Sequence, residues 1–248
     1  MRAARGDSAT TFPDEDTWKG RSGGRPFAAL PFASCFAYLP GGTGRVCEEG
    51  RLLCTRLKAM DRTWLPHLSA RVWLERVGHG HFCAELGGGV VLIPVPGSNP
   101  AQSAQWVGGC LAWCLKEVGL AAEVWPLLQR RHAVRKSAFA PAGERPSVLE
   151  HYRSFAVERA FWGTHFDRFN RAASRGRSGL RLTLVDDVIT RGRTLLAAAA
   201  RTRQVFPGAE IRAFAFLRTL GPAEMLSQVL DPCEGEVRWV SGDARRCP

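Results

Sequence analysis

The segment 182–195 constrains the fold more than any other part of the chain, and its sequence is LTLVDDVITRGRTL. An apolar run that ends in two acids indicates a buried strand whose carboxyl end reaches a polar ligand. The short loop after the acids leads into residues 194–205, which we expect to form a helix. A strand, a polar loop and a helix in this order are typical of α/β proteins, whose ligands bind beyond the carboxyl ends of the strands.

The acids and the loop offer the groups that a sugar phosphate needs. Asp186 and Asp187 can accept hydrogen bonds from ribose hydroxyls and can bind Mg²⁺, which prefers oxygen ligands. The backbone N–H groups of residues 190–194 can surround a phosphate at a helix N-terminus, and Gly192 lets the backbone come close. The alternative is that the acids only cap the helix. Because adjacent aspartates repel each other, we favour a ligand that compensates them.

This segment resembles the signature with which type I phosphoribosyltransferases bind 5-phosphoribosyl pyrophosphate (PRPP), a hydrophobic strand followed by Asp-Asp-x-x-Thr-x-Gly-x-Thr. The resemblance implies that Asp186 and Asp187 contact the ribose hydroxyls, with Mg²⁺ as cofactor. It implies that the 5′-phosphate is bound by Thr190, Arg191, Gly192, Arg193 and Thr194. The chain departs from the signature at Arg191 and Arg193, where small residues are usual. These long side chains must either point outward or reach the phosphate.

The rest of the chain predicts an α/β fold with a parallel sheet flanked by helices, because strands and helices alternate. Apolar runs predict strands at residues 27–39, 89–96, 123–128, 181–185 and 210–217. Apolar residues at helical spacing predict helices at residues 46–60, 65–76, 100–119 and 194–205. We divide the chain into a disordered basic tail (1–25), a small N-terminal hood or accessory region (26–88), a phosphoribosyltransferase-like core (89–225) and a C-terminal extension (226–248).

A second loop ends the strand at residues 89–96 and contains Pro96, Gly97 and Ser98. The Pro-Val-Pro run before it resembles the ComF-like branch of the family, and the resemblance implies that this loop contacts pyrophosphate. An ordinary strand-to-helix turn, capped by Ser98 or Asn99, is the alternative.

The basic stretch 130–157 contains further candidates, among them Arg130, Arg135 and Lys136. In type I phosphoribosyltransferases a loop in this region closes over PRPP, so the resemblance implies that Arg130 and Lys136 assist catalysis by stabilising the leaving pyrophosphate. The alternative is a solvated basic loop.

Upstream, Tyr38 and Lys58 lie where ComF-like proteins carry an aromatic strand and a helix with Leu-Lys, whereas the zinc-binding cysteine cluster of that branch is absent.

Bulk properties restrict the partners and the compartment. The net charge of +11 favours anionic ligands or nucleic acid, although a solvated Arg-rich surface explains the charge equally well. The eight cysteines include no C-x-x-C pair and no apolar leader is visible, so we expect free thiols in the cytoplasm and no membrane partner. A homodimer is compatible with the sequence.

The resemblance implies transfer of a 5-phosphoribosyl group to an unidentified nitrogen acceptor, a small molecule, with release of pyrophosphate. Two alternatives stay open. The first is a non-catalytic sensor of PRPP or nucleotides on the same fold, because a fold does not guarantee turnover. The second is a ComF-like accessory of DNA uptake, for which nucleic acid is the partner.

Overall fold

The computed structural model describes residues 29–61, 63–101, 107–135, 144–158, 179–221 and 224–248. Its strands are β1 (Ala29–Tyr38), β2 (Gly87–Pro94), β3 (Ala121–Val124), β4 (Leu128–Arg130), β5 (Phe155–Val157), β6 (Arg181–Ile189), β7 (Glu210–Thr219), β8 (Leu230–Val240) and β9 (Asp243–Cys247). Its helices are α2 (Arg45–Lys58), α3 (Leu65–Gly78), α4 (Val107–Glu117), α5 (Val148–Ser154) and α7 (Arg193–Val205). The tail predicted at residues 1–25 and the candidate Lys136 lie outside the described residues.

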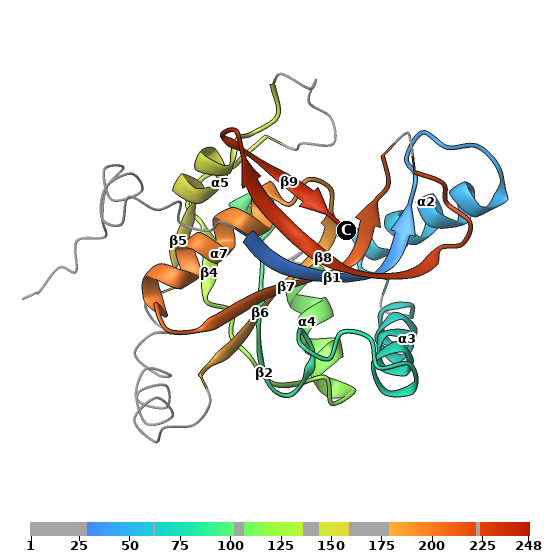
Figure 1. Cartoon of the computed structure of the whole chain (residues 1–248), viewed down its shortest axis with the longest axis horizontal. Coiled ribbons are helices and arrows are strands. Elements are labelled where there is room, and N and C mark those ends of the chain that lie inside the picture. The colour runs from blue at the N-terminus through green and yellow to red at the C-terminus, as the bar shows by residue number, and fades with distance from the viewer. Residues whose placement is uncertain (1–28, 62, 102–106, 136–143, 159–178, 222–223) are drawn as a thin grey trace, which may run out of the picture.

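Seven strands form one sheet in the order β3-β2-β6-β7-β1-β8-β9 (Figure 1). The five strands from β3 to β1 run parallel, and β8 and β9 continue the sheet antiparallel beyond β1. Strands β4 and β5 form a separate antiparallel pair. The prediction of an α/β fold with a parallel sheet flanked by helices is confirmed, and the sheet is mostly rather than wholly parallel.

Helices cover both faces of the sheet, and each face has its own core. On one face α5 and α7 pack through Val148, Tyr152 and the apolar side of α7 that includes Leu195 and Leu196. On the other face α2, α3 and α4 contribute Leu57, Leu68, Leu111 and others. Figure 1 shows α7 and α5 on the opposite side of the sheet from α3 and α4. Because β6 is covered on both sides, its side chains from Leu182 to Val185 are buried whichever way they point.

The observed element boundaries agree with those predicted from the sequence at the centre of the sheet and differ from them at its margins. The strand predicted at 123–128 is two short strands, β3 and β4, with Pro126 between them. Proline has no N–H for a ladder, which explains the break. The predicted helix at 100–119 is seen as α4, while residues 102–106 lie outside the described part of the chain.

The predicted regions 26–88 and 226–248 both contribute strands to the central sheet. Strand β1 lies between β7 and β8, so of the predicted hood only α2 and α3 stand outside the sheet. The predicted C-terminal extension contains the β8–β9 hairpin, which reaches the sheet through β1. The sheet therefore combines the first and the last described strands of the chain.

Helix α2 approaches β1 closely because Gly50 has no side chain. A Cβ placed on Gly50 would lie 2.9 Å from the Cβ of Tyr38 and 3.3 Å from its Cα. Real Cβ atoms essentially never come as near as 2.9 Å, and the Cβ of Tyr38 is bonded directly to the backbone, so it cannot swing aside like the tip of a flexible side chain. This close approach seats α2 against β1, and Lys58 is the last residue of the same helix.

We expect Gly50→Ala to lower the free energy of unfolding by about 1–2 kcal/mol, since overpacking against β1 outweighs the gain in helix propensity. Gly78→Ala is the matched control, because a Cβ placed on this glycine of α3 would have no neighbour within 4 Å. Urea unfolding of both variants measures the difference. Equal stability of the two would show that α2 does not depend on this close approach.

Candidate functional site

The carboxyl ends of the parallel strands border a cavity of about 490 Å³, a volume typical of small-molecule sites. Every residue predicted for binding or catalysis that the structure describes lines this cavity. The predicted residues on its wall are Pro96, Gly97, Ser98, Arg130, Asp186, Asp187, Thr190, Arg191, Gly192, Arg193 and Thr194. Thus the two loops that the sequence singled out separately face one cavity.

Asp186 and Asp187 lie near the end of β6, and the cations around them come from both faces of the sheet. The Lys58 ammonium, from the α2 face, donates to Oδ2 of Asp187 at 2.7 Å. The backbone N–H of Val188 donates to Oδ1 of the same carboxylate at 2.8 Å, so both oxygens of Asp187 have partners. The side chain of Asp187 is 18% exposed and that of Lys58 is 54% exposed. The ammonium therefore reaches inward from the rim of the cavity.

Asp186 belongs to the other face, where it interacts with the charge of Arg130, and the charge of Lys58 acts on it as well. Burial raises the pKa of Asp186 well above its ordinary value, and the neighbouring charge of Asp187 raises it further. Its Oδ1 accepts one hydrogen bond, from the N–H of Asp187 at 2.9 Å. Burial lowers the pKa of Arg130 to about 10, while the charge of Asp186 acts in the opposite direction. Even with that pKa the guanidinium stays charged at neutral pH.

Arg130 is fixed in place rather than carried on an open loop. Its Nε donates to the Gly97 carbonyl at 3.1 Å, and its Nη1 donates to the Ser154 hydroxyl and to the His151 carbonyl. Its Nη2 lies 3.2 Å from Nδ1 of His151, and the guanidinium stacks 3.8 Å from the centre of the Phe155 ring. The predicted role in a closing loop therefore does not fit its buried position, although its charge does face the cavity.

The contact with Arg130 sets the tautomer of His151. Arginine can only donate, so Nδ1 of His151 accepts and the ring proton lies on Nε2, a buried atom with no partner among the described residues. Burial lowers the pKa of His151 to about 4, and the positive charge of Arg130 lowers it further. The imidazole is neutral at physiological pH.

The loop between β6 and α7 has the geometry of an anion site. Gly192 precedes α7 with φ 84°, a left-handed conformation that favours glycine, and no side chain caps the helix there. A Cβ on Gly192 would lie 2.5 Å from Cγ2 of Val237 on β8, so glycine is required both for its conformation and for space. Arg193 and Thr194, the first residues of α7, line the cavity, and the N–H groups of a first helical turn have no partner within the helix.

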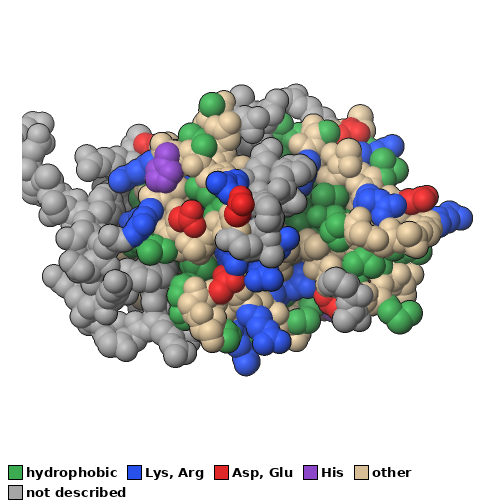
Figure 2. Space-filling view, turned by 90° about the horizontal axis from the view of Figure 1, so that it is seen from above, with side chains coloured by type: hydrophobic (Ala, Val, Ile, Leu, Met, Phe, Trp, Pro, Cys, Tyr) green, Lys and Arg blue, Asp and Glu red, His purple; other side chains and the backbone are tan. Residues whose placement is uncertain are grey.

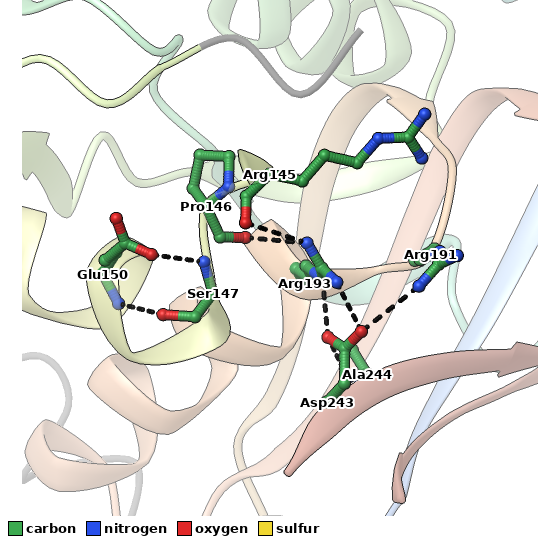
Figure 3. A network of polar contacts seen from close by, with 8 residues as sticks. All are labelled: Arg145, Pro146, Ser147, Glu150, Arg191, Arg193, Asp243 and Ala244. Atoms are coloured by element: carbon green, nitrogen blue, oxygen red, sulfur yellow. Dashed lines mark hydrogen bonds and ion pairs between the residues drawn. The ribbon is translucent and has the colours of Figure 1, made fainter. Parts of the chain in front are cut away.

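The two arginines of this loop both reach Asp243, and they do so unequally (Figure 3). Arg193 forms a forked ion pair with Asp243 at the start of β9, and its Nη1 donates to the carbonyls of Arg145 and Pro146 at 3.3 and 3.0 Å. Arg191 reaches Asp243 with one nitrogen at 3.3 Å and is half exposed. Arg193 therefore ties the loop to the segment before α5 and to the C-terminal hairpin, whereas Arg191 remains accessible from the cavity.

The second loop is held by its carbonyl groups. The Gly97 carbonyl accepts from Arg130, and the Ser98 carbonyl accepts from the N–H of Val134 at 2.8 Å. Because the C=O and N–H of a trans peptide point in opposite directions, the Ser98 N–H points away from Arg130. Asn99 caps the following turn, since its Oδ1 accepts from the N–H of Ala101 at 3.0 Å. The predicted capping alternative is thus compatible with a binding role for Gly97 and Ser98.

The acidic pair is a poor fit for Mg²⁺ held by the protein alone. Mg²⁺ takes six oxygen ligands, and no cluster of three or more Asp, Glu, His or Cys side chains that could hold a metal occurs among the described residues. The Lys58 ammonium already stands against Asp187, and burial disfavours the charged form of Asp186. With Asp187 paired to Lys58 and the charged form of Asp186 disfavoured, the pair offers little excess negative charge to a dication.

Sequence reasoning did not assign site roles to several residues on the cavity wall, namely Tyr38, Lys58, Val107, Arg145, His151 and Val188. The sequence did contain a signal for Lys58 and Tyr38, because both lie in the N-terminal segments that resemble ComF-like proteins. Arg135 also lines the cavity and pairs with Glu144 at 2.6 Å. On the face shown in Figure 2, Lys and Arg side chains lie close to acidic ones, so exposed cations are partly neutralised there.

No protein-family model matches the chain, and no curated protein shows significant similarity to it. Among the described helices, none combines the length and the hydrophobicity that crossing a membrane requires.

Substitution of the two loop arginines tests their unequal roles. We expect Arg193→Ala to lower the free energy of unfolding by about 2–4 kcal/mol, because Asp243 loses its forked ion pair and two carbonyls lose a donor. We expect Arg191→Ala to cost less than about 1 kcal/mol, as is usual for an exposed ion pair. Urea unfolding gives both values, and similar losses would contradict the assigned difference.

His151 makes stability depend on pH. Its pKa is about 4 in the folded protein and near 6.5 in the unfolded chain, so between these values only the unfolded chain takes up a proton. The free energy of unfolding therefore falls as the pH falls from 6.5 to 4, by on the order of 3 kcal/mol from this group. Asp186, whose pKa is raised, acts in the opposite direction.

His151→Asn isolates the contribution of His151 to the pH dependence of stability. The Asn side-chain oxygen can still accept a hydrogen bond from Arg130, but the Asn side chain does not titrate. We expect thermal unfolding of this variant to change less between pH 6.5 and 4 than that of the wild type. His67→Asn, at an exposed position of α3, is the control and keeps the wild-type slope. The assignment is wrong if His151→Asn keeps the wild-type slope as well.

Proposed function

We propose that the cavity binds PRPP and that the protein is a phosphoribosyltransferase of the type I, ComF-like kind. The observation that carries this proposal is the arrangement at the end of β6. Two half-buried carboxylates are followed within the same cavity by an uncapped helix N-terminus, which begins at left-handed Gly192. The carboxylates suit the vicinal hydroxyls of a ribose, and the helix N-terminus suits a phosphate.

The cavity offers a distinct group for each part of the ligand. Asp186 and Asp187 accept from the ribose hydroxyls, and the loop 190–194 binds the 5′-phosphate. The pyrophosphate lies toward Gly97, Ser98 and the fixed charge of Arg130. Because both ends of PRPP are held, the bond between the ribose C1 and the pyrophosphate oxygen can break while a nitrogen acceptor approaches C1.

Charges in the cavity match those that develop in this transfer. C1 of the ribose becomes positive, and the carboxylates lie on the ribose side of the cavity. The leaving pyrophosphate becomes more negative, and Arg130 faces that side without reorganising. A Mg²⁺ ion carried by the pyrophosphate would add Lewis-acid stabilisation of the leaving group. The free thiols agree with the cytoplasmic compartment that we propose for this reaction.

We expect the double variant Asp186→Asn, Asp187→Asn to bind PRPP at least about a hundredfold more weakly, because it loses charge-assisted hydrogen bonds to the hydroxyls. Calorimetric titration measures the loss, and circular dichroism verifies the fold. Glu49→Gln on the exposed side of α2 is the control with unchanged affinity. Unchanged affinity in the double variant would sink the site assignment.

Two further measurements sharpen the result. The wild type binds ribose 5-phosphate more tightly than 2-deoxyribose 5-phosphate, and this preference is lost in the double variant. Release of pyrophosphate with a panel of nucleobases and amines then separates an enzyme from a sensor, since a sensor binds PRPP without releasing pyrophosphate.

A further inference from the structure

We propose that the ammonium of Lys58 occupies the cation position at the acidic pair, so that the cavity binds its sugar phosphate without a divalent metal at Asp187. The sugar part of this inference rests on the proposed function. The metal part concerns only Lys58 and Asp187 and can be tested without any ligand.

Geometry supports this assignment first. The Lys58 nitrogen lies 2.7 Å from Oδ2 of Asp187, although the two residues are 129 positions apart in the sequence. The N–H of Val188 takes the other oxygen of Asp187. A dication bound at this carboxylate would have to displace the ammonium or lie beside it, and both arrangements are unfavourable.

The position of Lys58 is also built into the fold. Lys58 is the last residue of α2, whose Leu57 is buried in the core and whose Gly50 lies so near Tyr38 that an added Cβ would clash. Burial by itself would lower the pKa of Lys58, yet the charge and hydrogen bond of Asp187 raise it overall. The ammonium is thus a permanent charge at physiological pH.

The N–H donors of the Lys58 ammonium that Asp187 does not use suit a phosphorylated ligand. An ammonium has three donors, and among the described residues Lys58 uses one, on Asp187. The other two remain for a hydroxyl or a phosphate oxygen in the same cavity, which Lys58 lines. Lys58 therefore neutralises Asp187 and positions it, which are the two tasks that a metal ion performs at an acidic pair.

Lys58→Met removes the charge but keeps the length of the side chain, and Lys58→Arg keeps the charge. Lys116→Met is the matched control, because Lys116 also lies in the last turn of a helix, and its ammonium stands over the Trp113 ring. Thermal unfolding verifies that all four proteins fold.

The first arm uses Mn²⁺ alone, detected by electron paramagnetic resonance. We expect Lys58→Met to bind Mn²⁺ at least tenfold more tightly than the wild type, Lys58→Arg or Lys116→Met. Adding Asp187→Asn to Lys58→Met abolishes this gain. Equal Mn²⁺ affinity of wild type and Lys58→Met, including no measurable binding by either, overturns the inference.

The second arm titrates PRPP in EDTA and in Mg²⁺. We expect the affinity of the wild type to differ less than threefold between the two conditions, whereas Lys58→Met loses at least tenfold in EDTA and regains it with Mg²⁺. Wild-type binding that requires Mg²⁺ contradicts the inference and leaves the proposed function intact. If PRPP binds under neither condition, the proposed function fails, and the Mn²⁺ arm still decides the role of Lys58.

Discussion

The carboxylates at the end of β6 determine how the rest of the cavity is arranged, because charge beside a doubly covered strand must be compensated locally. Alternation along the strand turns Asp186 and Asp187 to opposite faces. The charge of Lys58 acts on both acids, and Asp186 also interacts with Arg130. Lys58 comes from the α2 face and Arg130 from the α5 face. The two helical layers thus each bring one positive group to the same strand end.

A second interaction keeps the loop after these acids in place. Arg193 connects the start of α7, the segment before α5 and the start of β9 through hydrogen bonds to Asp243 and two carbonyls. Glu150 and Ser147 in turn form a capping box that fixes the start of α5. An arginine that looks misplaced in a phosphate-binding loop therefore serves as its anchor, and the ligand side of the loop is left to backbone N–H groups.

Much of the fold and of the candidate site could be predicted from the sequence, because the residues that form them are close together in the chain. The strand β6, its acids, the loop and α7 are contiguous, and alternating strands and helices indicate the parallel sheet. The contacts of Lys58 and Arg193 could not be predicted, since they join residues 129 and 50 positions apart. The same holds for β8, whose alternation is weak, with charged and polar residues along much of its length. Its place is decided by pairing with β1, a partner from the other end of the described chain.

The insertion of β1 between β7 and β8 links distant parts of the molecule mechanically. The hairpin that presents Val237 and Asp243 to the loop is attached to the parallel strands through β1. Loss of the pairing between β1 and β8 would therefore remove the link by which the hairpin joins the sheet. The order of the anion-binding turn in this way depends on strand pairing far from the turn itself.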